Sequence, residues 1–130
     1  MYLIDSSVWI DFLNDKTSDK VDQCIALEQS GLTMLIYMEV LQGANSQKKF
    51  NLYQSYLSEQ PFYNFKDIIK SYEQAAKIYF DCRQKGITIR STIDCLVAQC
   101  AIENNLILLH NDKDFKQIAK IYPLLRLQQI

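Results

Sequence analysis

The chain has 130 residues, of which 48% are hydrophobic and 22% are charged, with fourteen basic side chains against fifteen acidic ones. This length and composition are typical of a globular domain with its own core, so we expect one domain over residues 1–130. The net charge of −1 disfavours proteins that bind nucleic acid through a broadly basic surface, and a chain of this charge would need local cations to hold phosphate.

In the first half of the chain, short apolar runs alternate with segments of helical periodicity. Strands carry apolar runs of a few residues, whereas helices repeat their apolar positions every three to four residues. In chain order we expect a strand at Tyr2–Ile4, helices at Ser6–Leu13 and Thr17–Ser30, a strand at Leu32–Ile36, helices at Met38–Ala44 and Gln47–Leu57, and a strand at Phe62–Phe65. Gly31 suits the end of the second helix.

The second half continues the alternation. Asp67–Lys85 has the clearest amphipathic pattern and is followed by Gly86 as a cap, while Ser91–Glu103 is apolar nearly all round and predicts a central helix. The remaining expected elements are a strand at Leu106–Leu109, a helix at Phe115–Ile121 and a strand at Leu124–Leu127. Such alternation predicts an α/β fold, a central parallel sheet of four to five strands with helices on both faces.

The cysteines and the apolar runs indicate the compartment. Cys24, Cys82, Cys95 and Cys100 form no C-x-x-C pair and have no histidine at zinc-site spacing, so we expect free, buried thiols. No apolar run approaches the length of a membrane span, and the start of the chain lacks the pattern of a secretory signal. We therefore expect a cytoplasmic protein without a membrane partner.

Acidic residues from distant parts of the chain follow expected strands or begin expected helices. They are Asp5, Glu39, Asp94, Asp112 and Asp114. Ligands of open α/β sheets bind outside the carboxyl ends of the strands, and these positions can therefore meet at one edge.

Each acid also has a purely structural interpretation. Asp5 and Asp112 suit helix N-caps or Asx turns, and Asp94 suits a capping box with Ser91. Glu39 is harder to explain in this way, because apolar residues surround it in the sequence and an isolated buried charge is very costly.

Taken together, the acids favour a cation site. Carboxylates about 6 Å apart repel one another by roughly 3 kcal/mol per pair at an effective dielectric constant near 20. Lys113, the nearest basic residue in the sequence, does not neutralise four acids. A site of oxygen ligands without histidine or thiolate favours Mg²⁺, with Mn²⁺ as an alternative, and such a site suits phosphodiester hydrolysis by metal-activated water.

Four segments, in order, resemble PIN-domain proteins, and most closely the VapC-type toxins of bacterial toxin–antitoxin pairs. The segments are YLIDSSVWIDFL, IYMEVLQGA, GITIRSTIDCLVAQCAIENN and ILLHNDKDFKQIAK. With the spacers between them they cover almost the whole chain. The resemblance implies a PIN-like three-layer α/β/α fold. It also implies a Mg²⁺-dependent endoribonuclease that acts on RNA, is inhibited by a cognate antitoxin and forms a homodimer.

Matched position by position, the resemblance implies that Asp5, Glu39, Asp94 and Asp112 are the catalytic acids. Metal binding would fall to Asp5 and Asp94 most directly, with Asp112 and Asp114 completing or bridging the shell. In this scheme Glu39 positions or deprotonates the attacking water.

Two neighbouring residues have supporting roles. By the same resemblance, Ser6 stands where a small hydroxyl residue supports the first aspartate. Arg90 precedes the helix that carries Asp94, and either clamps a backbone phosphate of the substrate or pairs with a neighbouring acid at the surface.

The sequence leaves two other functions open. One is a non-catalytic, receiver-like signalling module that binds Mg²⁺, although Asp5 is followed by Ser6 and Ser7 rather than by a second acid. The other is a PIN-type nuclease that acts on structured DNA, which the absence of long extra loops in 130 residues disfavours.

Overall fold

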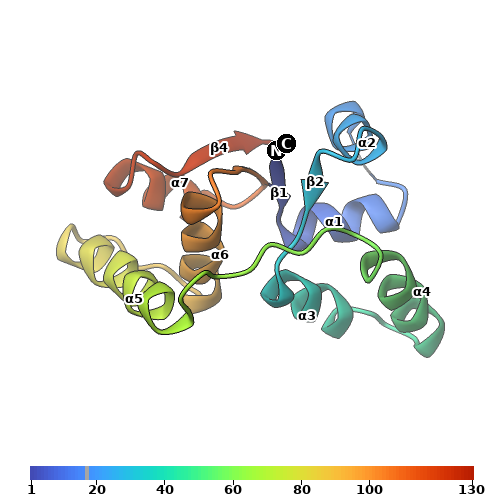
Figure 1. Cartoon of the computed structure of the whole chain (residues 1–130), viewed down its shortest axis with the longest axis horizontal. Helices are drawn as coiled ribbons and strands as arrows, with labels where there is room; N and C mark the ends of the chain where they lie inside the picture. The colour runs from blue at the N-terminus through green and yellow to red at the C-terminus, as the bar shows by residue number, and fades with distance from the viewer. Residues whose placement is uncertain (17) are drawn as a thin grey trace.

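A computed structural model of the chain describes residues 1–16 and 18–130. Its centre is a parallel sheet in the order β2-β1-β3-β4 (Figure 1). The strands are β1 (Tyr2–Ile4), β2 (Ser30–Gly31), β3 (Ile107–His110) and β4 (Arg126–Gln129). Ile4 pairs with Leu109 in the parallel register of β1 and β3, and the chain leaves both strands at the same edge of the sheet.

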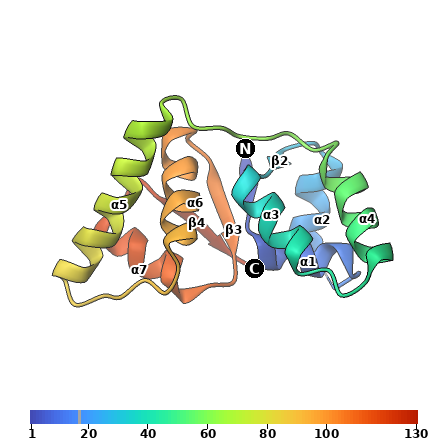
Figure 2. The ribbon, with the colours of Figure 1, turned by 90° about the horizontal axis from the view of Figure 1, so that it is seen from below.

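Helices cover the sheet on two sides. The first group is α1 (Ser6–Leu13), α2 (Asp19–Ala26), α3 (Met34–Gln42) and α4 (Gln47–Leu57). The second is α5 (Ile68–Gln84), α6 (Thr92–Glu103) and α7 (Lys113–Ile121). Figure 2 shows the two groups on opposite sides of β1 and β3. The predicted three-layer α/β/α arrangement with a central parallel sheet is therefore confirmed, with four strands of the predicted four to five.

The predicted strand at Leu32–Ile36 is wrong, and the cause is a helix cap. The Thr33 hydroxyl accepts a hydrogen bond from the Ile36 backbone N–H at 3.0 Å, which begins α3 at Met34. The apolar run thus belongs to a helix, and the predicted helix at Met38–Ala44 begins four residues too late. A short apolar run cannot by itself distinguish a buried strand from a buried helix turn.

Strand β2, which pairs with β1, lies just before the predicted strand, at Ser30–Gly31, where the sequence predicted the end of a helix. Helix α2 stops at Ala26, and Glu28 takes a left-handed φ of 55° after it; Thr17, the first residue of the predicted helix, lies outside the described residues. Gly31 is not a helix cap but part of β2, where a Cβ atom would lie 2.5 Å from the Pro61 carbonyl oxygen. Glycine is needed there because another segment of backbone comes so close.

Two other predicted strands differ in extent. Phe62–Phe65 contributes one parallel bridge, between Leu32 and Phe62, rather than a strand. The last strand begins at Arg126 instead of Leu124, and it is an edge strand with polar side chains, which gives it a weak hydrophobic pattern.

The core lies where α6 packs between α5 and the sheet. Every residue from Cys95 to Ala101 is buried, which confirms the prediction that this helix is central. Trp9 is fully buried on the other side, and all four cysteines are free and buried as expected. Among the described residues, no helix has both the length and the apolar character that crossing a membrane requires.

Candidate active site

A cavity of about 380 Å³ opens at the edge of the sheet where β1 and β3 end. It is lined by Asp5, Ser6, Ser7, Glu39, Arg90, Ser91, Asp94, Asn111 and Asp112. Four of the predicted acids, from segments far apart in the chain, therefore share one cavity, which we call the acid cavity. The strands position two of them, since Asp5 follows β1 and Asp112 follows β3.

Asp5 lies deepest, with 6% of its surface exposed. It occupies the N-cap position of α1, but among the described residues its side chain caps no later N–H of that helix. Burial raises the pKa of Asp5 to about 7, and repulsion from Glu39 and Asp112 adds to the rise. Hydrogen bonds from the Ser6 backbone and the Ser7 side chain act in the opposite direction. Ser7 is a partner of the acid that the sequence did not reveal.

Glu39 projects from the second turn of α3, not from the first as the sequence predicted. Its side chain is half-buried, and burial raises its pKa against the opposing effect of a hydrogen bond with the Ser6 side chain. Ser6 thus contacts two acids, Asp5 through its backbone and Glu39 through its hydroxyl. In the part of the chain that the structure describes, Glu39 Oε1 is buried without a hydrogen-bond partner. An unpartnered buried carboxylate oxygen is a group that a proton or a cation would stabilise.

Asp94 lies in the first turn of α6. The capping of this helix does not need it, because the Ser91 hydroxyl accepts a hydrogen bond from the Ile93 N–H at 3.2 Å. Over residues 1–16 and 18–130, no hydrogen bond joins the Asp94 carboxylate to the Ser91 N–H, so the predicted capping box is absent. Burial raises the pKa of Asp94 to about 7, followed by repulsion from Asp5, Asp112 and Glu39.

Asp112 follows β3 and serves as a helix cap as well as a cavity acid. Its Oδ1 accepts a hydrogen bond from the Asp114 N–H at 2.9 Å, so the capping interpretation holds for this residue. The Asp112 N–H donates to Nδ1 of His110 at 3.1 Å, and the His110 ring is buried against Phe115. The buried His110 ring therefore fixes the loop that carries Asp112.

Asp114 is buried, with 4% of its surface exposed, and its partner is Arg90. Asp114 Oδ2 accepts from the Arg90 backbone N–H at 3.2 Å and from Nε at 3.1 Å. Arg90 Nη2 donates to Asp112 Oδ1 at 3.1 Å. Of the two roles predicted for Arg90, the structure shows the ion pair with neighbouring acids.

The donor set fits a hard divalent cation. One carboxylate oxygen from each of Asp94, Asp112 and Asp114 lies within 4.8 Å of the others. At that separation, two ionised carboxylates repel by roughly 3 kcal/mol at an effective dielectric constant near 20. The ligands are all oxygens, and Glu39 Oε1 lacks a partner among the described residues. Burial and mutual repulsion both disfavour the ionised forms of Asp5 and Asp94 and so raise their pKa. A bound divalent cation would offset both effects by stabilising the negative charges.

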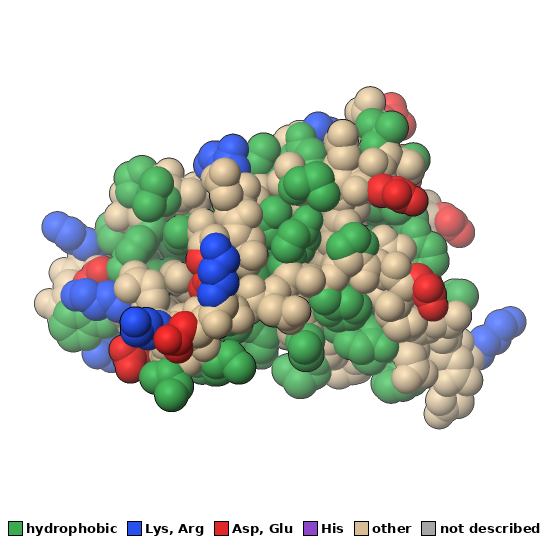
Figure 3. All heavy atoms as spheres, in the orientation of Figure 1, with side chains coloured by type: hydrophobic (Ala, Val, Ile, Leu, Met, Phe, Trp, Pro, Cys, Tyr) green, Lys and Arg blue, Asp and Glu red, His purple; other side chains and the backbone are tan. Residues whose placement is uncertain are grey.

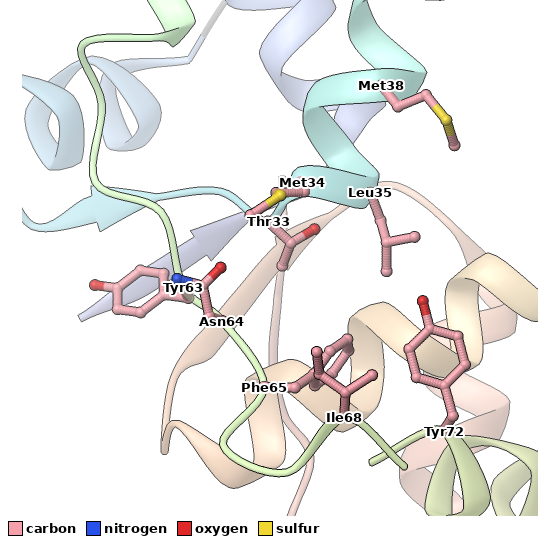
Figure 4. Close-up of a pocket in the computed structure, with 9 residues that line it drawn as sticks. All are labelled: Thr33, Met34, Leu35, Met38, Tyr63, Asn64, Phe65, Ile68 and Tyr72. Atoms are coloured by element: carbon pink, nitrogen blue, oxygen red, sulfur yellow. The ribbon is translucent and has the colours of Figure 1, made fainter.

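A second cavity, of about 470 Å³, lies between α3 and the start of α5 and has a different character. Its lining is mainly apolar: Thr33, Met34, Leu35, Met38, Tyr63, Asn64, Phe65, Ile68 and Tyr72 (Figure 4). We call this surface the apolar groove. Hydrophobic side chains are also visible at the surface over the middle of the face in Figure 3. The lining of the apolar groove includes no carboxylate, imidazole or amine, so it offers no group to bind a metal ion or activate water.

The chain matches a known family over most of its length. The family model described as the PIN domain matches residues 2–121. The chain is 33% identical over 126 residues to the VapC ribonuclease Mb1587 of Mycobacterium bovis, with 93% of each chain covered. It has the same identity and coverage with the ribonuclease VapC11 of Mycobacterium tuberculosis.

Solved structures support the same fold. A VapBC2 complex from Rickettsia felis, bound to a DNA fragment from its promoter, matches 99% of this chain and 98% of its own, with a TM-score of 0.77 and 23% identity. A DNA-bound VapBC complex from Salmonella typhimurium matches 98% and 96%, with a TM-score of 0.76 and 17% identity. At these identities the likeness establishes the fold alone.

Proposed function

The chain belongs to the PIN-domain family, and on that premise we propose that it is a metal-dependent endoribonuclease, the toxin of a toxin–antitoxin pair. One observation carries the proposal for this chain: Asp5, Glu39, Asp94 and Asp112 converge on a single cavity from four separate segments. The names of the relatives supply the substrate class, because VapC11 and Mb1587 are called ribonucleases.

The residues assigned to the metal are Asp5, Asp94, Asp112 and Asp114, and their oxygen donors favour Mg²⁺ or Mn²⁺. When bound, such an ion lowers the pKa of water and stabilises negative charge on the phosphate oxygens. Glu39 is the proton acceptor in this scheme, since its Oε1 is buried without a partner among the described residues and burial raises its pKa.

The proton balance of the reaction follows from these positions. The oxygen of a water molecule forms a bond to phosphorus, one phosphorus–oxygen ester bond breaks, and the leaving oxygen takes up a proton from solvent water. Glu39 accepts the proton that the attacking water loses. Ser6 holds Glu39 in place through the hydrogen bond between their side chains.

Arg90 is assigned to the substrate phosphate. Its side chain is 66% exposed and lines the same cavity as the acids. The ion pairs with Asp112 and Asp114 hold the guanidinium at the rim without removing it from solvent. Arginine suits this task because its planar fork of donors matches phosphate oxygens.

The partners follow from the family. We propose RNA as the substrate and a cognate antitoxin protein as the inhibitor, because the VapBC complexes are structural neighbours of this chain. A homodimer, a cytoplasmic location and a single domain over residues 1–130 belong to the same proposal. The two alternative functions, a receiver-like signalling module and a nuclease for structured DNA, are not favoured by relatives named as ribonucleases.

The proposal is tested with purified chain and single-stranded RNA. We expect cleavage in Mg²⁺ or Mn²⁺, loss of cleavage in EDTA, and recovery when the metal is returned in excess. A branched DNA of matched length, assayed beside the RNA, distinguishes the two nuclease substrates. RNA cleavage that persists undiminished in EDTA contradicts the proposal.

A further inference from the structure

Arg90 occupies the acid cavity in an unusual way, because it bridges two of the acids assigned to the metal. Nε contacts Asp114 Oδ2 and Nη2 contacts Asp112 Oδ1, each at 3.1 Å. The Arg90 backbone N–H adds a third hydrogen bond to Asp114 Oδ2. Arg90 is thus held along one edge of its guanidinium and at its own backbone N–H.

This contact distinguishes the acids by their partners. Asp112 and Asp114 share the positive charge of Arg90. The described structure shows no ion pair for Asp5, Glu39 or Asp94, although Asp94 offers an oxygen within 4.8 Å of oxygens of Asp112 and Asp114. Among the described residues that line the cavity, Arg90 is the only basic one. The charges of Asp112 and Asp114 are therefore paired with a cationic side chain, and those of Asp5, Glu39 and Asp94 are not.

We propose that Arg90 takes the place of a second metal ion, so that the cavity binds a single divalent cation, held by the acids without an ion pair, Asp5 and Asp94. Nucleases with two metals use the second ion to stabilise charge on the oxygens of the reacting phosphate. A guanidinium held between Asp112 and Asp114 supplies positive charge from a fixed position in the same cavity. In this arrangement Asp114 is a positioning residue that holds Arg90, and this role replaces its assignment to the metal under the proposed function.

The remaining donors of Arg90 are available to a substrate. Its two ion pairs use Nε and Nη2, and in the described part of the chain no hydrogen bond engages Nη1. A phosphate oxygen at the cavity rim can therefore bind Arg90 while the ion pairs persist. The inference rests on the proposed function and deepens it, because it specifies the number of metal ions and gives Asp114 the role of holding Arg90.

The experiment counts bound metal rather than product. The full-length chain is titrated with Mn²⁺, and bound ions per chain are measured from the loss of the free Mn²⁺ signal in electron paramagnetic resonance, with calorimetry as a second readout. The expected stoichiometry is one. In Arg90→Ala, the uncompensated Asp112 and Asp114 should bind a further ion, which raises the stoichiometry to two. Adding Asp114→Asn to Arg90→Ala should return it to one.

Two further variants serve as controls, one for the general loss of a positive charge and one for loss of folding. Lys113→Ala removes an exposed positive charge next to Asp112 in the sequence and should leave one ion bound. Arg90→Gln removes the charge but keeps hydrogen-bonding capacity, and it replaces Arg90→Ala if circular dichroism shows that the alanine variant is unfolded.

The outcomes separate the two proposals. Two ions in the unaltered chain, or one ion in the folded Arg90 variant, overturns the role of Arg90 but leaves metal-dependent cleavage intact. No bound Mn²⁺ in the unaltered chain overturns both. One ion rising to two, together with no cleavage of RNA, supports the role of Arg90 as a counter-ion and contradicts the proposed function alone.

Discussion

The acid cavity and the apolar groove are two hollows in the described part of the molecule, and the larger of the two has no carboxylate, imidazole or amine in its lining. The apolar groove has a volume of about 470 Å³ and is lined mainly by apolar side chains. The acid cavity has a volume of about 380 Å³, and four carboxylates line it. Helix α3 contributes to both, with Glu39 in the acid cavity and Leu35 in the apolar groove. Convergent titratable groups with raised pKa, rather than volume, are therefore the reason that the acid cavity is the proposed active site.

The first prediction concerns catalysis and carries the largest expected effect. Asp94→Asn should lower the rate of RNA cleavage in Mg²⁺ by at least about 100-fold, the range typical for removing one catalytic group. The substitution keeps the size of the side chain and removes one charge from the metal set. Single-turnover cleavage, with circular dichroism to verify folding, measures the effect. Full activity in this variant would remove Asp94 from the mechanism.

The second prediction concerns stability. A substitution in the acid cavity that impairs catalysis should stabilise the fold when no metal is bound. Asp5→Asn should stabilise the metal-free chain at pH 8 by roughly 1–3 kcal/mol, because it removes a buried carboxylate whose pKa lies at about 7. Urea unfolding in EDTA measures the difference. Saturating Mn²⁺ should reverse the order, since the unaltered chain binds the ion better. A loss of stability without metal would mean that the cavity already compensates Asp5.

The pH dependence gives the third test. An unfolded aspartate titrates near its ordinary pKa of 3.8, whereas Asp5 and Asp94 titrate at about 7 in the fold. The folded chain therefore holds more protons between pH 4 and 7, so the free energy of unfolding should fall as the pH rises through that window. In EDTA, this fall should be larger for the unaltered chain than for a variant with both Asp5→Asn and Asp94→Asn. Equal pH dependence in the two chains contradicts the raised pKa values.

The apolar groove provides the smallest expected effect. Ile68→Ser alters a side chain that is 66% exposed, so the free energy of unfolding should change by no more than about 0.5 kcal/mol. Mn²⁺ binding and RNA cleavage should remain unchanged, because the groove shares no lining residue with the acid cavity. A large loss of cleavage would show that the two regions are not independent.

The sequence predicted those features that depend on local pattern. Helices Ser6–Leu13 and Gln47–Leu57 have the predicted bounds. Asp5 and Asp112 line one cavity, as predicted from the rule that ligands bind at the carboxyl ends of parallel strands. The rule applies here because β1 and β3 are parallel neighbours in register, so that the chain leaves both at the same edge. Two short apolar runs in the sequence were enough to predict these two strands.

Features that depend on tertiary contacts could not be predicted in this way. The ion pair between Arg90 and Asp114 joins residues 24 positions apart, and no local pattern distinguishes it from a phosphate clamp. The prediction of a strand at Leu32–Ile36 is wrong because the Thr33 side chain caps a helix that begins within this apolar run. Ser7 and His110 act through single hydrogen bonds to Asp5 and Asp112, which only the folded geometry reveals.

Anomalous diffraction from crystals of the chain grown with Mn²⁺ would show directly whether the acids hold a metal ion. We expect one anomalous peak in the acid cavity, within ligand distance of Asp5 and Asp94, while Arg90 stays paired with Asp114. A cavity without any anomalous peak at saturating Mn²⁺ would contradict the assignment of these acids to a metal site.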